Sequence, residues 1–356
     1  MSQRAKDGRP LEEVVSLAVK YTMAAQRALP RAGPGAKPKV PDWVLAAMVT
    51  VSVFLRKKSK NAQFSWWCDH LDDFQRWFPG QPFPGRSTFY DRYRRIWMLF
   101  QKAIELQGQD AVSKGWANAE VVAIDKSLIA GRGRPWGPGD RRRKHVPRRV
   151  DRDTTWSYSK HDGWVQGYSF ETVVTAASKG TCWPLSASCD TASRSEQKSC
   201  LSKFESLPQQ TTHVLADAGY DSNAVAEAVE YKDDGCRTGR HFLCPEVPRP
   251  HAKNSRQTKS RQSHERQRHR RRRDQRRTYF QSEIGRELYA RRKTTAEPFN
   301  SHLKMLFDLD DRVWHWGLDN NRSMVLGAIF AYQTLLTFNH RHRRQNRCIK
   351  CILDRL

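Results

Sequence analysis

Two short apolar runs, each followed by an aspartate, constrain the fold of this chain more than any other feature of its sequence. The run 121–124 leads into Asp125, and the run 213–216 leads into Asp217. Apolar runs of this length that are rich in β-branched residues are typical of buried strands. A charge at the end of such a strand is costly to desolvate unless it is paired or binds a cation. If the two strands are neighbours in one sheet, both carboxylates lie at one rim, where open α/β sheets place their ligands.

The region around these runs has the pattern of a mixed sheet. Short apolar segments predict strands at 120–130, 167–178, 182–190, 212–220 and 240–247. Helices are predicted between them, at 195–207 and 222–232. Three strands in succession, followed by strands that alternate with helices, predict a mixed α/β sheet with helices packed on its faces. Trp164 and Tyr168 are expected to shape a hairpin beside the first strand.

Helical segments are predicted on both sides of this region. Residues 1–40 combine a helix at 11–28 with a linker rich in Pro, Gly and Lys. Residues 41–114 form a helical module with helices at 43–55, 64–78 and 87–106, the last capped by Ser87. This module either binds nucleic acid like a helix-turn-helix or packs on the next domain, and both interpretations stay open. The domain at 115–340 ends in further helices, including a core helix at 323–338, and a basic tail follows at 341–356.

The charge balance indicates a polyanionic partner. Lys and Arg number 63 against 37 Asp and Glu, a net charge of +26 that would repel itself in a compact protein without counter-ions. Two strongly basic segments, 131–152 and 249–277, have little to bury and are predicted to be loops or arms. Their Arg/Lys clusters either neutralise nucleic-acid phosphates or are solvated runs; we favour the first. The residues concerned are Arg141, Arg142, Arg143, Lys144, Arg270, Arg271, Arg272 and Arg273.

The cellular compartment follows from what the sequence does not contain. No apolar stretch approaches the length of a membrane span, and no segment resembles a signal peptide. The eight cysteines are scattered and are expected to stay reduced. We therefore expect a soluble cytoplasmic protein associated with the nucleoid.

A third carboxylate is expected from a helix, and Glu297 is the best candidate. Thr294 or Thr295 caps a predicted helix whose first turn holds Glu297 and Pro298. Lys304 lies seven residues after the glutamate, two helical turns further along the same face. The opposite stripe of this helix is apolar, so the polar face is free for chemistry.

Carboxylate oxygens of this kind are the ligands that Mg²⁺ or Mn²⁺ prefers. Two such ions activate the attacking oxygen and stabilise the leaving oxygen in phosphodiester chemistry. In this interpretation Asp125 bridges two ions, while Asp217 binds one of them and Glu297 the other. Lys304 then contacts a phosphate, and no protein nucleophile is required.

These motifs resemble those of the DDE transposases of bacterial insertion sequences. In that family one aspartate follows a hydrophobic strand and the second lies in a motif like ADAGYDS (216–222). The glutamate lies in a motif that resembles YARRKTTAEPFNSHLK (289–304), and the resemblance covers roughly 115–340. It implies a ribonuclease H-like catalytic fold and cleavage and strand transfer at the ends of a mobile element. It also implies double-stranded DNA with terminal inverted repeats, a target DNA, and a homodimer in the DNA complex.

The last motif resembles the tyrosine-arginine-glutamate-lysine signature of these enzymes. Glu297 and Lys304 match its spacing of six intervening residues, and Tyr289 and Arg292 would be the partners that contact phosphate. Four residues separate Arg292 from Glu297 where the signature has three, so Lys293 is the alternative to the arginine. Two other functions fit a basic chain with this fold. One is a nuclease without sequence specificity, and the other is a DNA-binding descendant of a transposase that no longer cuts.

Overall fold

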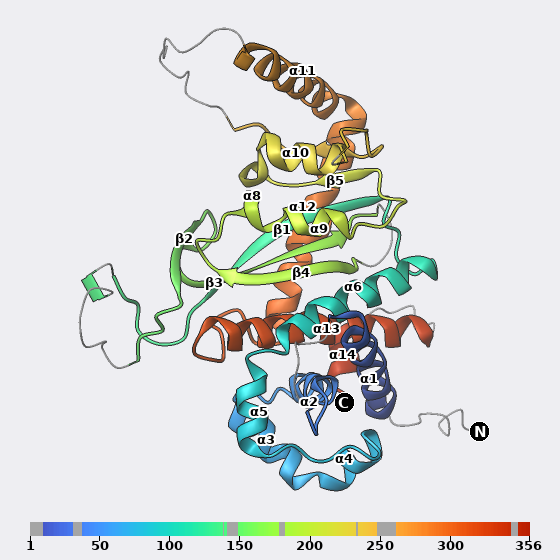
Figure 1. The fold of residues 1–356 in the computed structure, drawn as a ribbon, viewed down its shortest axis with the longest axis vertical. Coiled ribbons are helices and arrows are strands. Elements are labelled where there is room, and N and C mark those ends of the chain that lie inside the picture. The colour runs from blue at the N-terminus through green and yellow to red at the C-terminus, as the bar shows by residue number, and fades with distance from the viewer. Residues whose placement is uncertain are drawn as a thin grey trace.

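The structure is a computed structural model that describes residues 10–30, 38–137, 139–140, 149–177, 182–232, 234–247, 261–342 and 348–356. The molecule is elongated, with helices gathered at one end, a twisted sheet in the middle and a basic helix at the other end (Figure 1). The sequence motifs of interest lie on the sheet and on one long helix that crosses it.

The sheet has the mixed polarity that was predicted, but it has six strands where five were predicted. Its strands are β1 (Val121–Ala130), β2 (Thr155–Ser159), β3 (Gly163–Thr175), β4 (Pro184–Thr191), β5 (His213–Leu215) and β6 (His241–Leu243). The order is β2-β3-β1-β5-β6, and β4 pairs with β3 outside this path. The pairs among β1 to β4 are antiparallel, whereas β1, β5 and β6 run parallel. The hairpin expected around Trp164 is formed by β2 and β3, where Trp164 pairs with Tyr158.

Asp125 lies in the middle of β1, so the prediction that it ends a strand is wrong. β1 continues to Ala130 because its other edge pairs with β3 along this whole stretch. The parallel neighbour β5 pairs only with residues 121–123 and stops at Leu215. Only β5 ends at the rim that the sequence predicted. Asp125, two residues beyond the last pair with β5, lies beside this rim in the continuing strand β1.

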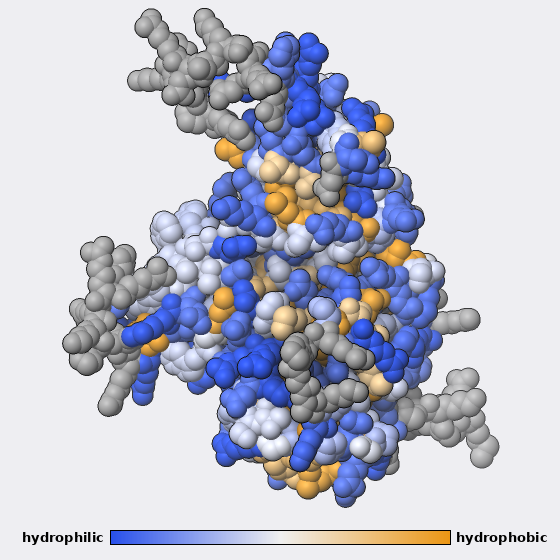
Figure 2. All heavy atoms as spheres, in the orientation of Figure 1, coloured by the Kyte–Doolittle hydropathy of each residue, from blue (hydrophilic) through white to orange (hydrophobic). Residues whose placement is uncertain are grey.

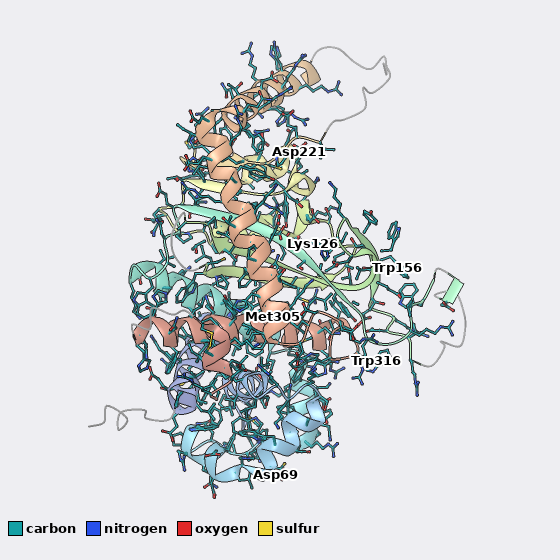
Figure 3. The ribbon with its side chains drawn as sticks, turned by 180° about the vertical axis from the view of Figure 1, so that it is seen from behind. Asp69, Lys126, Trp156, Asp221, Met305 and Trp316 are labelled. Carbon is teal, nitrogen blue, oxygen red and sulfur yellow. A yellow bond between two sulfur atoms is a disulfide. The ribbon has the colours of Figure 1, made fainter. Side chains whose placement is uncertain are left out.

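Alternate residues of β1 face two different hydrophobic clusters, as the two-residue period of a strand requires. Val122 and Ile124 belong to a cluster beneath α8 (Glu196–Ser199), α9 (Leu201–Glu205) and α10 (Asn223–Glu230). Val121 and Ala123 belong to the main core on the other face. That face is crossed by α12 (Glu283–Leu306), which contacts β1, β3 and β5 (Figure 3). Asp125 points to the α12 face and Lys126 to the opposite one.

The helical end of the molecule is one packed unit. It contains α1 (Pro10–Ala28), α2 (Asp42–Phe54), α3 (Lys60–Asp69), α4 (Leu71–Trp77), α5 (Arg86–Tyr93), α6 (Trp97–Ser113), α13 (Leu318–Arg341) and α14 (Ile349–Leu353). α13 is buried along most of its length and contacts α1, α2, α6 and β4. Among the described helices, none is long and apolar enough to cross a membrane.

Two predicted helices of this unit are in fact four. The segment 64–78 divides at His70 into α3 and α4, and the segment 87–106 divides between α5 and α6. The predicted cap at Ser87 is wrong, because α5 begins at Arg86 and its N-cap residue is Gly85. Near the C-terminus Cys348 and Cys351 form a disulfide, so the expectation of reduced thiols is wrong for this pair.

The C-terminal part of the chain differs from prediction in two helices. Part of the basic segment 249–277 belongs to a regular helix, α11 (Arg261–Gln281), instead of a loop, while 248–260 lie outside the described residues. The helix predicted to begin near residue 296 actually begins at Glu283, so Thr294 and Thr295 do not cap it. Their hydroxyls both donate to the carbonyl of Arg291 inside the continuous helix. The basic cluster Arg141, Arg142, Arg143 and Lys144 also lies outside the described residues.

Candidate active site

Asp125 is a buried carboxylate held from α12. Only 7% of the residue is exposed. Its Oδ1 accepts a hydrogen bond from Arg292 at 2.6 Å, and its Oδ2 accepts one from the amide of Asn300 at 2.8 Å. Burial raises the pKa of Asp125 to about 6; the charge of Arg292 opposes this, while the negative charges of Asp217 and Glu297 add to it. The charged form of this side chain therefore depends on nearby cations.

Asp217 reaches the same place from the neighbouring strand. It stands two residues beyond β5 and caps the short helix η2 (Ala218–Tyr220), where the amide of Gly219 donates to its Oδ1 at 2.8 Å. This leaves Oδ2 to face Arg292, at 3.8 Å. Asp217 can therefore cap η2 with one carboxylate oxygen and face Arg292 with the other.

Glu297 is supplied by α12, one residue before a proline inside the helix. Its side chain is 51% exposed, and its Oε1 accepts a hydrogen bond from Arg292 at 3.0 Å. Pro298 has no N–H, so the carbonyl of Thr294 loses its regular helical partner at this point. The helix continues through the proline, and Glu297 therefore has a position fixed by tertiary packing.

One guanidinium group joins the three acids. Arg292 lies 2.6 Å from Asp125, 3.8 Å from Asp217 and 3.0 Å from Glu297. Lys293, the alternative that the signature spacing allowed, is exposed, whereas Arg292 is buried. The structure thus brings together the three carboxylates that the sequence singled out, around a single positive charge.

The two other residues of the signature lie on the same helix. The pKa of Tyr289 is raised to about 12, mainly by burial, and its side chain also feels the charges of Arg292, Asp217 and Glu297. Burial lowers the pKa of Lys304, while Asp162, Asp310 and Asp125 oppose this shift. Both side chains therefore stand within electrostatic range of the carboxylates.

The arginines of α11 have two different environments. Arg272 contacts Glu227 at 2.9 Å and lies over the ring of Tyr231, and Arg273 contacts Asp221 and Glu246. Arg270 and Arg271 are exposed. Figure 2 shows hydrophilic residues over this helix at one end of the molecule. Two of the four arginines that were predicted to bind phosphate in this helix are therefore engaged within the chain.

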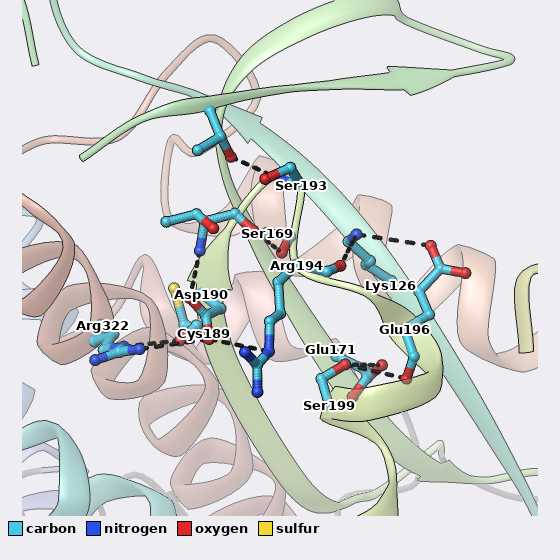
Figure 4. A network of polar contacts seen from close by, with 12 residues as sticks. Lys126, Ser169, Glu171, Cys189, Asp190, Ser193, Arg194, Glu196, Ser199 and Arg322 are labelled. Atoms are coloured by element: carbon cyan, nitrogen blue, oxygen red, sulfur yellow. Dashed lines mark hydrogen bonds and ion pairs between the residues drawn. The ribbon is translucent and has the colours of Figure 1, made fainter. Parts of the chain in front are cut away.

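Sequence reasoning missed a second group of charged residues on the opposite face of the sheet (Figure 4). Lys126 lies 3.7 Å from Glu196, the first residue of α8. Burial and the negative charge of Asp217 raise the pKa of Glu196 to about 7, and Lys126 opposes this. The available signal was a glutamate that opens a predicted helix directly after a predicted strand. Asn300, in contrast, lies one turn after Glu297 on the polar helix face that the sequence predicted.

The donor set suits a hard divalent cation, although the acids contact an arginine in this arrangement. Within the described ranges, no three His, Cys, Asp or Glu side chains are close enough to hold a metal ion as they stand. Carboxylate oxygens are nevertheless the preferred ligands of such ions, and Arg292 shows that the three acids converge on one cation. The buried Oδ1 of Asn300 has no hydrogen-bond partner, so an acceptor beside Asp125 is also free for a ligand.

Comparison with known proteins identifies the family. A family model described as a transposase DDE domain matches residues 116–333. The chain belongs to the DDE transposases. A cryo-EM structure of a piggyBac transposase synaptic complex with hairpin DNA has a TM-score of 0.38 and 11% sequence identity, covering 96% of this chain and 76% of that one. No curated protein matches the sequence.

Family membership settles the general activity. This DDE transposase is a DNA transposase, an enzyme that cleaves DNA and transfers the cut strands. DNA is therefore its partner, as the excess of basic residues predicted. Enzymes of this family generally use divalent metal ions, which agrees with the expected chemistry of the carboxylates.

Proposed function

We propose that Asp125, Asp217 and Glu297 are the catalytic carboxylates of a ribonuclease H-like domain and that they hold Mg²⁺ or Mn²⁺, as two ions. The observation that carries this proposal is the arrangement of the three acids around Arg292, at 2.6, 3.8 and 3.0 Å. Acids that come from a strand, a strand end and a helix share this place only through tertiary folding. A shared positive charge is also what a buried carboxylate such as Asp125 needs in order to ionise.

The protein residues then have separate tasks in strand cleavage. Bound ions would activate the attacking water or 3′-hydroxyl and stabilise the leaving oxygen. Asn300 fixes Oδ2 of Asp125, so the carboxylate keeps one orientation. With ions bound to the carboxylates, the guanidinium of Arg292 would be free to contact a DNA phosphate. Tyr289 and Lys304, on the same helix, contact neighbouring phosphates.

We further propose an element of the bacterial insertion-sequence type, with the tyrosine-arginine-glutamate-lysine signature at 289–304. Its substrates are double-stranded ends with terminal inverted repeats and a target DNA, bound by a homodimer. In this proposal residues 41–114 contribute to reading the ends, and residues 115–340 form the catalytic domain. Arg270, Arg271 and the cluster Arg141, Arg142, Arg143 and Lys144 add phosphate contacts.

The test uses the full chain and DNA that carries the ends flanking its gene. With Mg²⁺ or Mn²⁺ we expect cleavage at the ends and joining to target DNA. Random nicking would instead indicate a nonspecific nuclease, and shifted but intact DNA would indicate a binding protein.

A pair of variants tests the site itself. Asp125→Asn should bind the ends and leave them uncut, because it removes the charge that faces the cations. Asp311→Asn is a control at a far more exposed carboxylate, which pairs with its neighbour Arg312 and with no other described residue; this variant should cut like the parent protein. Cleavage by Asp125→Asn at the parental rate contradicts the assignment.

A further inference from the structure

Glu196 lies close to the proposed metal site although it comes from the other face of the sheet. A methyl group on Gly219 would fall 1.9 Å from Oε2 of Glu196 and 3.0 Å from Oδ1 of Asp217. The two carboxylate oxygens are therefore no more than about 5 Å apart. Two oxygens bound to one Mg²⁺ at about 2.1 Å each lie roughly 3 to 4 Å apart. The upper limit of about 5 Å for the separation of the Glu196 and Asp217 oxygens lies just above this range.

Gly219 lies beside both acids. A Cβ at this position would meet the carboxylate of Glu196 at 1.9 Å and Oδ1 of Asp217 at 3.0 Å, so a larger residue would displace the flexible side chain of Glu196. Glycine at residue 219 is therefore compatible with the approach of the two carboxylates.

The polar partners of Glu196 differ from those of Glu171, another acid on this face. Glu171 is buried and fully engaged by Lys203, Ser199 and Tyr220, with the latter two at 2.9 and 2.8 Å. The carboxylate of Glu196 accepts no hydrogen bond from the described residues, and its close cation is Lys126 at 3.7 Å. The Lys126 ammonium itself donates to the carbonyl of Arg194 at 2.8 Å. Glu171 is therefore a structural acid, whereas Glu196 retains unused acceptor capacity.

A second, independent feature points to a ligand at this rim. Asn300 is 95% buried, its amide nitrogen is bound to Asp125, and its Oδ1 has no partner. An unsatisfied buried carbonyl oxygen is unfavourable unless something binds it. Among the described residues, one acceptor without a donor therefore lies next to Asp125, on Asn300, and another lies near Asp217, on Glu196. Oxygen acceptors of this kind suit a hydrated divalent cation.

We propose that Glu196 is a fourth carboxylate of the active site, sharing a divalent cation with Asp217, and that Lys126 is the positive charge that it gives up when the ion binds. The inference rests on the proposed metal site of Asp125, Asp217 and Glu297. It adds a ligand that lies outside their motifs and enters the site from α8.

Binding of Mn²⁺ to the full-length protein without DNA tests the inference directly. Free Mn²⁺ is measured by electron paramagnetic resonance during titration of the parent protein and of single variants. Glu196→Gln should raise the Mn²⁺ dissociation constant at least about tenfold, the scale of effect that ligand-sphere changes produce. Lys126→Met should lower the constant, because the competing cation is gone. Glu205→Gln, an exposed glutamate nine residues further on, should leave it unchanged.

The variants separate the possible outcomes. If Glu196 serves only as the partner of Lys126, then Glu196→Gln and Lys126→Met will both leave Mn²⁺ binding unchanged, and the inference is overturned. Asp217→Asn distinguishes this from failure of the proposed function. Weaker binding in Asp217→Asn with normal binding in Glu196→Gln rejects the fourth ligand alone, whereas normal binding in both rejects the metal site itself. Near-ultraviolet circular dichroism identifies a misfolded variant. If Glu196→Gln is misfolded, Lys126→Met tests the inference instead, because it should tighten Mn²⁺ binding and misfolding would not.

Discussion

Asp125 has both of its carboxylate oxygens held by side chains of α12. Arg292 binds one oxygen and Asn300 the other. A carboxylate fixed in this way cannot rotate, so its orientation is set before a ligand arrives. The two donors have different chemistry, because the guanidinium supplies charge while the amide supplies only direction. Asn300 can therefore be changed without altering the net charge of the site.

Asn300→Leu is expected to lower the turnover number for end cleavage at least about tenfold, as loss of an orienting partner does at metal sites. Its Michaelis constant for the DNA should stay near the parental value, because the substitution leaves the phosphate-binding cations in place. Steady-state kinetics on an end substrate measures both parameters. A change confined to the Michaelis constant would contradict the positioning role.

His315 provides a pH-dependent contribution to stability away from the site. Burial lowers its pKa to about 3, and the charges of Lys60 and Arg132 add to this. The folded protein keeps the ring neutral, beside the hydroxyl of Tyr93 at 3.0 Å, while the unfolded chain takes up a proton below about pH 6.5. The unfolded state then binds more protons, so stability is lost as the pH falls from about 6.5 towards 3.

The parent protein should therefore lose about 2 kcal/mol of its free energy of unfolding between pH 7 and pH 5 that the His315→Gln variant does not lose. Urea unfolding of both proteins at pH 7 and pH 5 gives the two losses of stability. Other titrating groups contribute equally to both, so their effect cancels when one loss is subtracted from the other. An equal loss of stability in both proteins would show that His315 is not the group responsible.

At the scale of elements, α12 supplies most of the residues of the candidate site. Arg292, Glu297, Asn300 and Lys304 all lie on this helix, and α11 precedes it with one short break at Ser282. α11 has a face that is engaged within the chain through Arg272 and Arg273, and it also exposes Arg270 and Arg271. The two pairs have equal charge, so they form a matched comparison of DNA contact and folding.

Replacing Arg270 and Arg271 by Gln should weaken DNA binding and reduce the slope of log affinity against log salt by up to about 2, one unit per phosphate contact. Replacing Arg272 and Arg273 by Gln should instead lower the free energy of unfolding, because Glu227, Glu246 and Asp221 lose their partners. Filter binding over a salt series and urea unfolding measure the two effects. Identical behaviour of the two double variants would refute this division.

Particular elements show why the sequence predicted some of this fold and missed the rest. β1 and α13 were predicted because each contains an apolar run, and such a run is stable only when it is buried. α12 was predicted to begin only near residue 296 because a threonine pair before Pro298 has the local chemistry of a cap, whereas packing on the sheet keeps the helix continuous from Glu283. α11 was predicted as a loop because composition does not show that acids of α10 face its arginines. The three acids, and the helix face that carries Asn300, were recognisable from strand and helix patterns. The proximity of Glu196 and the contact of Asn300 with Asp125 depend on tertiary folding.

At the scale of the whole molecule, the net charge of +26 governs the interaction with DNA. Each phosphate that the protein neutralises releases a condensed counter-ion. If six or more phosphates are contacted, the affinity for end DNA should fall at least about a thousandfold between 50 and 200 mM salt. Fluorescence anisotropy over this range measures the slope, and an affinity that hardly changes with salt would contradict an electrostatic interface.

The length of α12 has a mechanical consequence. A helix of 24 residues extends about 36 Å, and this one starts next to the basic α11 and ends in the apolar core beside α13. Glu297 lies on this helix between an end that adjoins α11 and an end that is anchored in the core. Because α12 is one continuous helix, any displacement of α11 is carried along it towards Glu297, and the contacts of α12 with β1, β3 and β5 limit how far it reaches.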